Sequence, residues 1–389
     1  MTSTPPWLDP RAAYLHVPFC AHHCGYCDFA VTAGQDHLIE LYLDALGEEL
    51  KTLGEPKPVR TIFLGGGTPT YLTADQLKRL LRTINRWFPR DARVEFSIES
   101  TPDSLTAEKL KVLAAGGVTR ASVGVQSFQP DSLTALDRLH RTEHIPVAVN
   151  LVREAGLDFS LDLIFAAPGA TLESWSDDLE RAIAFGPSHL STYGLTYETG
   201  TPLWKQRKAG DVIAVPEEIE LAMLELAIDR LTAAGYEHYE VSNFAKPGKR
   251  CRHNETYWAN EAYYGFGVGA ARYIDGSREL NVRNTNDYIR KVLSGESPTF
   301  QRERLDDRNR AFETIGVQLR RIAGIDKAQF TRQTGFSLDS LIGERLRSLI
   351  EHGLLSDDGR TVRLTRRGFC VADAIIVDLM KANHEGMTS

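Results

Sequence analysis

Short runs of β-branched and aromatic residues alternate with longer amphipathic segments between residues 12 and 235. Six of these runs have the composition of buried strands: residues 13–17, 61–65, 94–99, 120–125, 159–165 and 189–195. Between them, apolar residues recur at helical spacing, for example in residues 36–53 and 73–88. A repeated strand–helix pattern of this kind predicts an α/β architecture with a parallel sheet. Six units are too few for a closed eight-stranded barrel and indicate an open partial barrel or a doubly wound sheet.

The pattern changes after residue 235. Residues 239–276 are dense in aromatics and glycines without a clean period, so we expect loops and short strands in a connecting region over residues 236–305. From residue 306 the chain becomes helical and charged, and residues 345–376 read as helix, turn, short hairpin and helix. The sequence therefore predicts a barrel domain over residues 1–235 and a winged-helix-like C-terminal domain over residues 306–389.

Composition excludes several classes of function. The net charge is −7 and the basic residues do not cluster, so we predict no nucleic-acid partner and expect the C-terminal domain to pack against protein. No run of about 18 apolar residues predicts a membrane span, and the N-terminus lacks a signal-peptide pattern. Five cysteines, an odd number, do not form a disulfide framework. We therefore expect a cytoplasmic protein.

Three of the five cysteines, Cys20, Cys24 and Cys27, lie within eight residues directly after the first predicted strand. Pro18 and Gly25 disfavour a helix there, so we expect a loop at the edge of the sheet where α/β proteins place their sites. A zinc site with His22 or His23 as fourth ligand is one reading, although a second C-x2-C pair is absent. An iron–sulfur cluster held by three thiolates is the reading we favour, because it leaves one iron open for a ligand.

Further polar or glycine-rich positions follow the next strands. Gly65–Gly67 end the second strand, where glycine allows a ligand to approach the backbone and reach its N–H groups. Glu99 ends the third strand, Gln126 follows the fourth and Asp162 lies in the fifth. Polar side chains at the carboxyl edge of a sheet favour a binding site there.

The spacing C-x3-C-x2-C, with an aromatic residue before the last cysteine, resembles the signature of the radical S-adenosylmethionine (SAM) superfamily. The resemblance implies a partial (β/α)6 TIM-like barrel in which Cys20, Cys24 and Cys27 bind a 4Fe–4S cluster. It also implies that SAM binds the fourth iron and is cleaved to a 5′-deoxyadenosyl radical when the cluster is reduced. Tyr14 and Tyr26 would contact SAM, with Tyr26 beside the adenine.

The resemblance extends to a subfamily, the oxygen-independent coproporphyrinogen III oxidases and their relatives, and covers nearly the whole chain. The residues that it assigns to SAM binding, besides the two tyrosines, are Gly66, Gly67, Thr68, Glu99, Gln126, Arg138 and Asp162. Carboxylates suit the ribose hydroxyls, and an arginine suits the SAM carboxylate. Residues 166–169 read AAPG where the subfamily usually reads GLPG, a departure that affects one backbone turn.

Two features separate oxidases from haem chaperones in this subfamily. The oxidases carry a fourth cysteine two residues after the third and a longer N-terminal arm, whereas this chain has Phe29 at that position and 19 residues before Cys20. Residues 251–258, CRHNETYW, resemble the HNxxYW motif of the radical SAM haem chaperones, the HemW group. The resemblance implies a protein that binds haem and delivers it to acceptors such as respiratory enzymes.

His253 is the candidate haem ligand, because imidazole is a common axial donor. Asn254, Tyr257 and Trp258 would then lie at the porphyrin, although a hydrogen-bonded structural role for His253 is the alternative. The expected cofactors are a 4Fe–4S cluster, SAM and haem, and the expected partners are haem acceptors and an electron donor to the cluster. Peripheral membrane contact, SAM cleavage and oligomeric state stay open. The alternatives are a coproporphyrinogen-decarboxylating oxidase, a radical SAM methyltransferase and a zinc-stabilised interaction protein.

Overall fold

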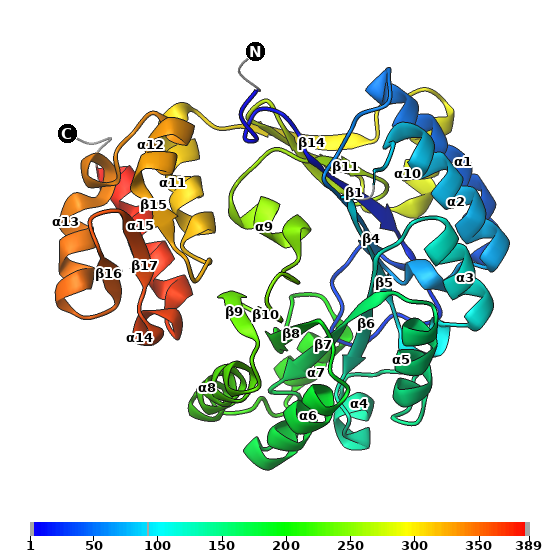
Figure 1. Cartoon of the computed structure of the whole chain (residues 1–389), viewed down its shortest axis with the longest axis horizontal. Coiled ribbons are helices and arrows are strands. Elements are labelled where there is room, and N and C mark those ends of the chain that lie inside the picture. Colours follow the sequence, from blue (N-terminus) through cyan, green and yellow to red (C-terminus); the bar gives the residue numbers. More distant parts are fainter. Residues whose placement is uncertain (1–3, 92, 386–389) are drawn as a thin grey trace.

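The computed structural model describes residues 4–91 and 93–385. Its largest element is a curved sheet of nine strands in the order β11-β1-β4-β5-β6-β7-β8-β10-β9, and helices cover its outer face (Figure 1). The six central strands are parallel: β1 (Ala12–Val17), β4 (Thr61–Gly66), β5 (Glu95–Ser100), β6 (Arg120–Gln126), β7 (Asp158–Phe165) and β8 (His189–Gly194). The open partial barrel is therefore confirmed over the doubly wound alternative, and each predicted strand agrees with its observed strand within about a residue.

The sheet is extended at both edges by strands from the connecting region. A parallel strand, β11 (Tyr264–Phe266), pairs with β1. Two antiparallel strands, β10 (Asn243–Ala245) and β9 (Glu237–Glu240), follow β8 at the other edge. The predicted domain boundaries at residues 235 and 305 stay predictions.

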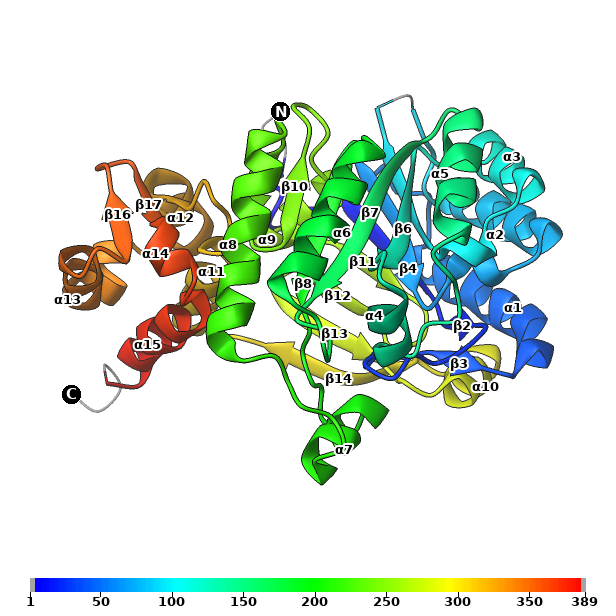
Figure 2. The same cartoon turned by 90° about the horizontal axis from the view of Figure 1, so that it is seen from below.

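The helices follow the strands in sequence: α1 (Ile39–Leu50), α2 (Ala74–Trp87), α3 (Ala107–Ala115), α4 (Pro130–Ala135), α5 (His144–Glu154), α6 (Leu172–Ala184), α7 (Pro202–Ala209) and α8 (Glu217–Ala233). Thr73 and Gln76 form a capping box at the start of α2. α7 projects away from the other helices (Figure 2). Within the described residues, no helix is both long and apolar enough to cross a bilayer.

The connecting region contains the short strands that we expected, but one part of it was predicted wrongly. Residues 252–258 form a helix, α9 (Arg252–Trp258), where a loop was expected. The remaining elements are α10 (Thr285–Leu293) and an antiparallel sheet of β12 (Ala271–Ile274), β13 (Ser277–Asn281) and β14 (Thr299–Arg304).

The C-terminal domain has a hydrophobic core of its own and lies beside the open side of the barrel (Figure 1). Its helices are α11 (Asp307–Gln318), α12 (Lys327–Thr334), α13 (Leu338–Glu351), α14 (Arg366–Phe369) and α15 (Ala372–Glu385). They surround a small sheet of β15 (Ile325–Asp326), β17 (Thr361–Leu364) and β16 (Leu355–Asp357). The order of helix, hairpin and helix after residue 338 is the winged-helix-like pattern expected from the sequence.

Candidate functional site at the carboxyl edge of the barrel

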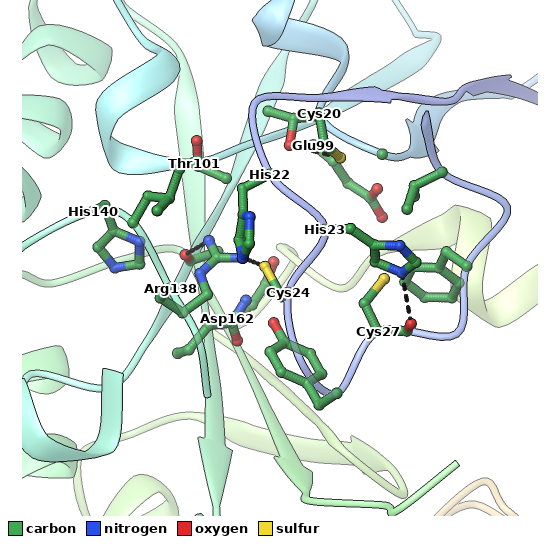
Figure 3. Close-up of a pocket in the computed structure, with 18 of the residues that line it drawn as sticks. Cys20, His22, His23, Cys24, Cys27, Glu99, Thr101, Arg138, His140 and Asp162 are labelled. Atoms are coloured by element: carbon green, nitrogen blue, oxygen red, sulfur yellow. Dashed lines mark hydrogen bonds between the residues drawn. The ribbon is translucent and has the colours of Figure 1, made fainter. Parts of the chain in front are cut away.

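The three clustered cysteines lie on the loop that follows β1, at the carboxyl edge of the barrel (Figure 3). Pro18 ends the strand, and a two-residue strand, β2 (Phe19–Cys20), pairs with β3 (Thr32–Ala33) to close the loop. The Cys27 amide donates to the Cys24 carbonyl oxygen at 3.1 Å, which turns the chain tightly between these two thiols. All three cysteines are partly buried free thiols.

The glycine segment forms the platform beneath this loop. Gly66 has a φ of 109°, and a Cβ there would lie 2.4 Å from the His16 ring. The Gly66 amide donates to Oε2 of Glu99 at 2.8 Å, and the Gly67 amide donates to the Val17 carbonyl at 2.8 Å. The Thr68 amide likewise donates a hydrogen bond, to the Phe19 carbonyl oxygen. Our expectation that this segment offers free N–H groups is therefore wrong. An amino group is a hydrogen-bond donor, so carbonyl oxygens are what the segment can offer it.

A single loop after α4 reaches across to the cysteines. Arg138 donates from Nη1 to Cys24 Sγ at 3.4 Å and from Nη2 to the Gly124 carbonyl oxygen at 2.9 Å. Its Nε is buried, and among the described residues it has no hydrogen-bond partner. A Cβ on Gly25 would lie 3.3 Å from Cβ of Asp137, so the two loops pack closely because residue 25 is glycine.

Two buried carboxyl groups lie between the platform and the neighbouring strands. Burial raises the pKa of Glu99 to about 7, although the Gly66 amide lowers it, and the charge of Asp162 raises it further. Burial also raises the pKa of Asp162, while the hydroxyls around it lower that pKa. One of these hydroxyls, that of Ser122, donates to Asp162 Oδ2 at 2.7 Å. Both carboxyl groups are therefore shielded from solvent and are placed to form hydrogen bonds with a ligand in the cavity.

Gln126 has a φ of 65° at a bulge where β6 leaves its pairing with β7. A left-handed conformation is uncommon in residues other than glycine and often marks a functional position. The side chain of Gln126 lines the cavity.

These groups surround one cavity of about 880 Å³. Its lining includes Cys20, Cys24 and Cys27 together with eight of the nine predicted SAM-binding residues: Tyr26, Gly66, Gly67, Thr68, Glu99, Gln126, Arg138 and Asp162. The ninth, Tyr14, does not line the cavity. Its hydroxyl pairs with Nδ1 of His16 at 3.0 Å, beneath the glycine platform.

Three thiols on one loop line the cavity, and thiolates are the usual ligands of an iron–sulfur cluster. Among the residues described, no three His, Cys, Asp or Glu side chains are grouped closely enough to hold one metal ion. Burial raises the pKa of Cys20 and of Cys27 to about 11, so each needs a nearby positive charge to become a thiolate. Iron supplies that charge when it binds, and the unpartnered Nε of Arg138 offers a further cationic donor.

Sequence reasoning missed some cavity residues. Tyr193 ends β8 and lines the cavity, so the strand-end rule that identified Glu99 would also have found it. Lys109 lines the cavity from α3, with Nζ donating to the Thr70 carbonyl oxygen at 2.7 Å. No local signal distinguishes Lys109 from a solvated lysine.

His253 lies at the opposite, amino-terminal end of the barrel. Its Nδ1 pairs with the Thr61 hydroxyl at 2.9 Å, and its Nε2 pairs with the Tyr257 hydroxyl at 2.8 Å. The ring stacks on Phe63 and is 1% exposed, and burial lowers its pKa to about 3. Both ring nitrogens are thus occupied, and iron could bind His253 only after this cluster opened.

The other predicted haem residues lie on the same helix. Tyr257 packs edge-on against His253 and Tyr263, and Arg320 of the C-terminal domain lies over the Trp258 ring. Asn254 is partly buried. The structure therefore separates these four residues from the cysteine cavity, and their part in haem binding stays a prediction.

The site has the arrangement of a radical SAM protein. Its three thiols follow the first strand of a partial barrel, beside a glycine platform, and a guanidinium contacts one of them. The family described as Radical SAM superfamily matches residues 14–182, and the family described as HemN C-terminal domain matches residues 305–371. Membership of this superfamily implies a 4Fe–4S cluster and SAM.

Relatives that match over nearly the whole chain show which radical SAM family this chain belongs to. The haem chaperone HemW of Bacillus subtilis (strain 168) is 39% identical over 92% of this chain and 96% of its own length. The haem chaperone HemW of Escherichia coli (strain K12) is 33% identical over 93% of this chain and 96% of its own length. Among solved structures, coproporphyrinogen III oxidase (HemN) from Escherichia coli aligns with a TM-score of 0.84 at 25% identity, covering 96% of this chain and 90% of that one. The chain belongs to the HemW family of haem chaperones, which favours the chaperone prediction over the oxidase.

Proposed function

We propose that this chain binds haem and delivers it to haem-requiring proteins, and that it holds a 4Fe–4S cluster and SAM in the cavity at the carboxyl edge of its barrel. The observation that carries the proposal is the convergence of three thiols and Arg138 on that cavity, in a chain whose full-length relatives are haem chaperones. Delivery to respiratory enzymes, an electron donor for the cluster, a cytoplasmic location and peripheral membrane contact are parts of the same proposal.

In this proposal Cys20, Cys24 and Cys27 bind the cluster, which supplies one-electron chemistry when it is present. Arg138 stabilises the thiolate of Cys24 and orients an anionic ligand group through its free Nε. The remaining SAM contacts are those predicted from the sequence, and Tyr14 acts through His16.

Metal analysis tests the cluster. Anaerobically purified protein should contain about four iron and four sulfide per chain, the content that defines a 4Fe–4S cluster. The variants Cys20→Ala, Cys24→Ala and Cys27→Ala should each lose it. Cys370→Ala is the matched control, because Cys370 is a free thiol outside the cavity. Zinc without iron or sulfide would instead favour the interaction-protein alternative.

Haem titration tests the function. Haemin added to the cluster-containing protein should give a Soret band that saturates at a fixed stoichiometry, and the haem should pass to an apo-acceptor. Incubation with coproporphyrinogen III, SAM and a reductant should yield no protoporphyrinogen, because Phe29 replaces the oxidases' fourth cysteine. Absence of haem binding would overturn the chaperone proposal, and formation of protoporphyrinogen would support the oxidase.

A further inference from the structure

Exposed apolar side chains gather at the mouth of the cysteine cavity. Phe29 is 67% exposed, Leu139 is 58% exposed and Tyr193 is 43% exposed, and all three line this cavity. Large exposed apolar groups around one opening mark a binding surface. Phe29 comes from the cysteine loop, Leu139 from the loop after α4 and Tyr193 from β8, so three separate segments of the barrel contribute one apolar side chain each.

An imidazole at the same mouth is arranged as a metal ligand. His22 lines the cavity (Figure 3), and its Nε2 pairs with Oδ2 of Asp137 at 2.8 Å. Within the described residues, no hydrogen bond engages Nδ1 of His22. Histidines that bind metals usually donate their other ring N–H to a carboxylate, which fixes the tautomer and raises the basicity of the ligating nitrogen. Here that arrangement leaves Nδ1 as the ligating atom.

The backbone holds Asp137 in place for this contact. Its φ is 56°, a conformation that aspartate tolerates better than most residues. The close packing of Gly25 against Asp137 keeps this loop beside His22. One short loop therefore presents the carboxylate that orients His22, the guanidinium of Arg138 and the exposed side chain of Leu139.

The volume of the cavity favours a large ligand at its mouth. A cavity of about 880 Å³ lies near the upper end of the roughly 300–1,000 Å³ usual for small-molecule sites, so a second ligand can lie above SAM. Haem offers an apolar plane and an iron that accepts a nitrogen ligand, and these match the apolar side chains and the imidazole at the mouth.

We propose that haem binds at the mouth of the cysteine cavity, with Nδ1 of His22 as an axial iron ligand. Phe29 and Leu139 contact the porphyrin. The inference rests on the proposed haem-chaperone function and gives that function a location. The lone pair of His22 Nδ1 forms the bond to iron and displaces a solvent or chloride ligand of haemin. The Nε2–H stays hydrogen-bonded to Asp137, so neither electrons nor protons are exchanged.

The test is a haemin titration of the cluster-containing protein and its variants, followed through the Soret band. His22→Ala should weaken haem binding by more than tenfold and abolish the spectrum of histidine-ligated iron, and added imidazole should restore that spectrum. Asp137→Asn should weaken binding by about tenfold, because it removes the carboxylate behind the ligand. Iron and sulfide are measured on each variant, so that loss of haem is separated from loss of the cluster.

Two controls accompany these variants. His37→Ala removes an exposed imidazole away from the cavity and should leave haem affinity unchanged. Leu139→Ser alters the apolar mouth without touching the cysteine loop and should weaken binding even if His22→Ala fails to retain a cluster. If the wild type binds haem and His22→Ala, Asp137→Asn and Leu139→Ser bind it equally well, the location is wrong while the function stands. If the wild type binds no haem, the function itself fails.

Discussion

Ala166 adopts a left-handed backbone conformation directly after β7, with a φ of 60°. This conformation costs a residue with a Cβ about 1–2 kcal/mol, whereas glycine adopts it freely. The position is the first residue of the AAPG segment, where the related subfamily usually has glycine. The departure that looked neutral in sequence therefore stores a small strain beside the site.

We expect Ala166→Gly to increase the free energy of unfolding by about 1 kcal/mol, because relief of strain exceeds the added entropy of the unfolded chain. Urea denaturation measures the change. Ala167→Gly is the matched control, since Ala167 lacks a positive φ and should lose roughly 0.5–1 kcal/mol on substitution. A destabilised Ala166→Gly variant would show that the turn tolerates the methyl group without strain.

His253 is buried with both nitrogens hydrogen-bonded, so we expect His253→Ala to lower the free energy of unfolding by about 3 kcal/mol. Chemical denaturation measures this loss. The folded variant should still take up haem if the site is at the cavity mouth.

The control is His37→Ala, an exposed imidazole whose removal should change stability by less than about 0.5 kcal/mol. Unchanged stability together with lost haem binding in His253→Ala would restore His253 as the ligand.

At the scale of elements, α9 begins on a carboxylate from a distant strand. Glu95, the first residue of β5, accepts the amides of Arg252 and His253 through its two oxygens, each at 3.2 Å. Its carboxylate also lies 3.7 Å from the buried guanidinium of Arg120. The cap residue Cys251 makes no side-chain cap of its own, so the helix depends on this tertiary contact.

Glu95→Ala should therefore lower the free energy of unfolding by about 3–5 kcal/mol, because it leaves the buried charge of Arg120 without its partner. Hydrogen exchange of the α9 amides should be faster in Glu95→Ala than in the wild type, whereas the amides of the central strands should change less. Glu55→Ala provides the comparison, since its ion pair with Lys57 is exposed and its loss should leave stability nearly unchanged. Protected α9 amides in Glu95→Ala would mean that the helix caps itself.

This contact also explains which elements could be predicted from sequence. The strands and α2 carry local signals, such as hydrophobic periodicity and the Thr73 capping box, and they were predicted correctly. The residues that line the cavity were predictable because they follow a known spacing and lie at strand ends. α9 was missed because its capping acid lies 157 residues earlier. The position of Tyr14 outside the cavity lining could not be read from the sequence, because strand periodicity does not show how deep a side chain lies, and its contact with SAM stays a prediction.

At the scale of the whole molecule, His238 of β9 joins the barrel to the C-terminal domain. Its ring stacks on Phe244 of β10 at 4.3 Å and meets Phe369 of α14 edge-on at 5.1 Å. Burial lowers the pKa of His238 to about 4, while the unfolded chain binds this proton near pH 6.5. The contribution of the neutral ring is therefore complete above pH 6.5 and is lost as the pH falls toward 4.

We expect His238→Phe, which cannot titrate, to gain stability relative to the wild type by about 1.4 kcal/mol for each pH unit below 6.5. Denaturation of both proteins between pH 8 and 5 measures the difference, which should be constant above pH 7. A difference that stays constant down to pH 5 would mean that the imidazole is protonated in the folded state.

α9 is fastened at both ends to different parts of the molecule. Its first turn is held by Glu95 at the floor of the barrel, and the carbonyl oxygens of Ala259 and Asn260 just after its last turn accept Gln333 Nε2 at 3.1 and 2.9 Å. Asn260 also donates to Thr314 of α11 at 2.9 Å. The helix therefore couples the C-terminal domain to the amino-terminal ends of the barrel strands: a displacement of that domain would be transmitted through α9 to the end of the barrel opposite the cysteine cavity.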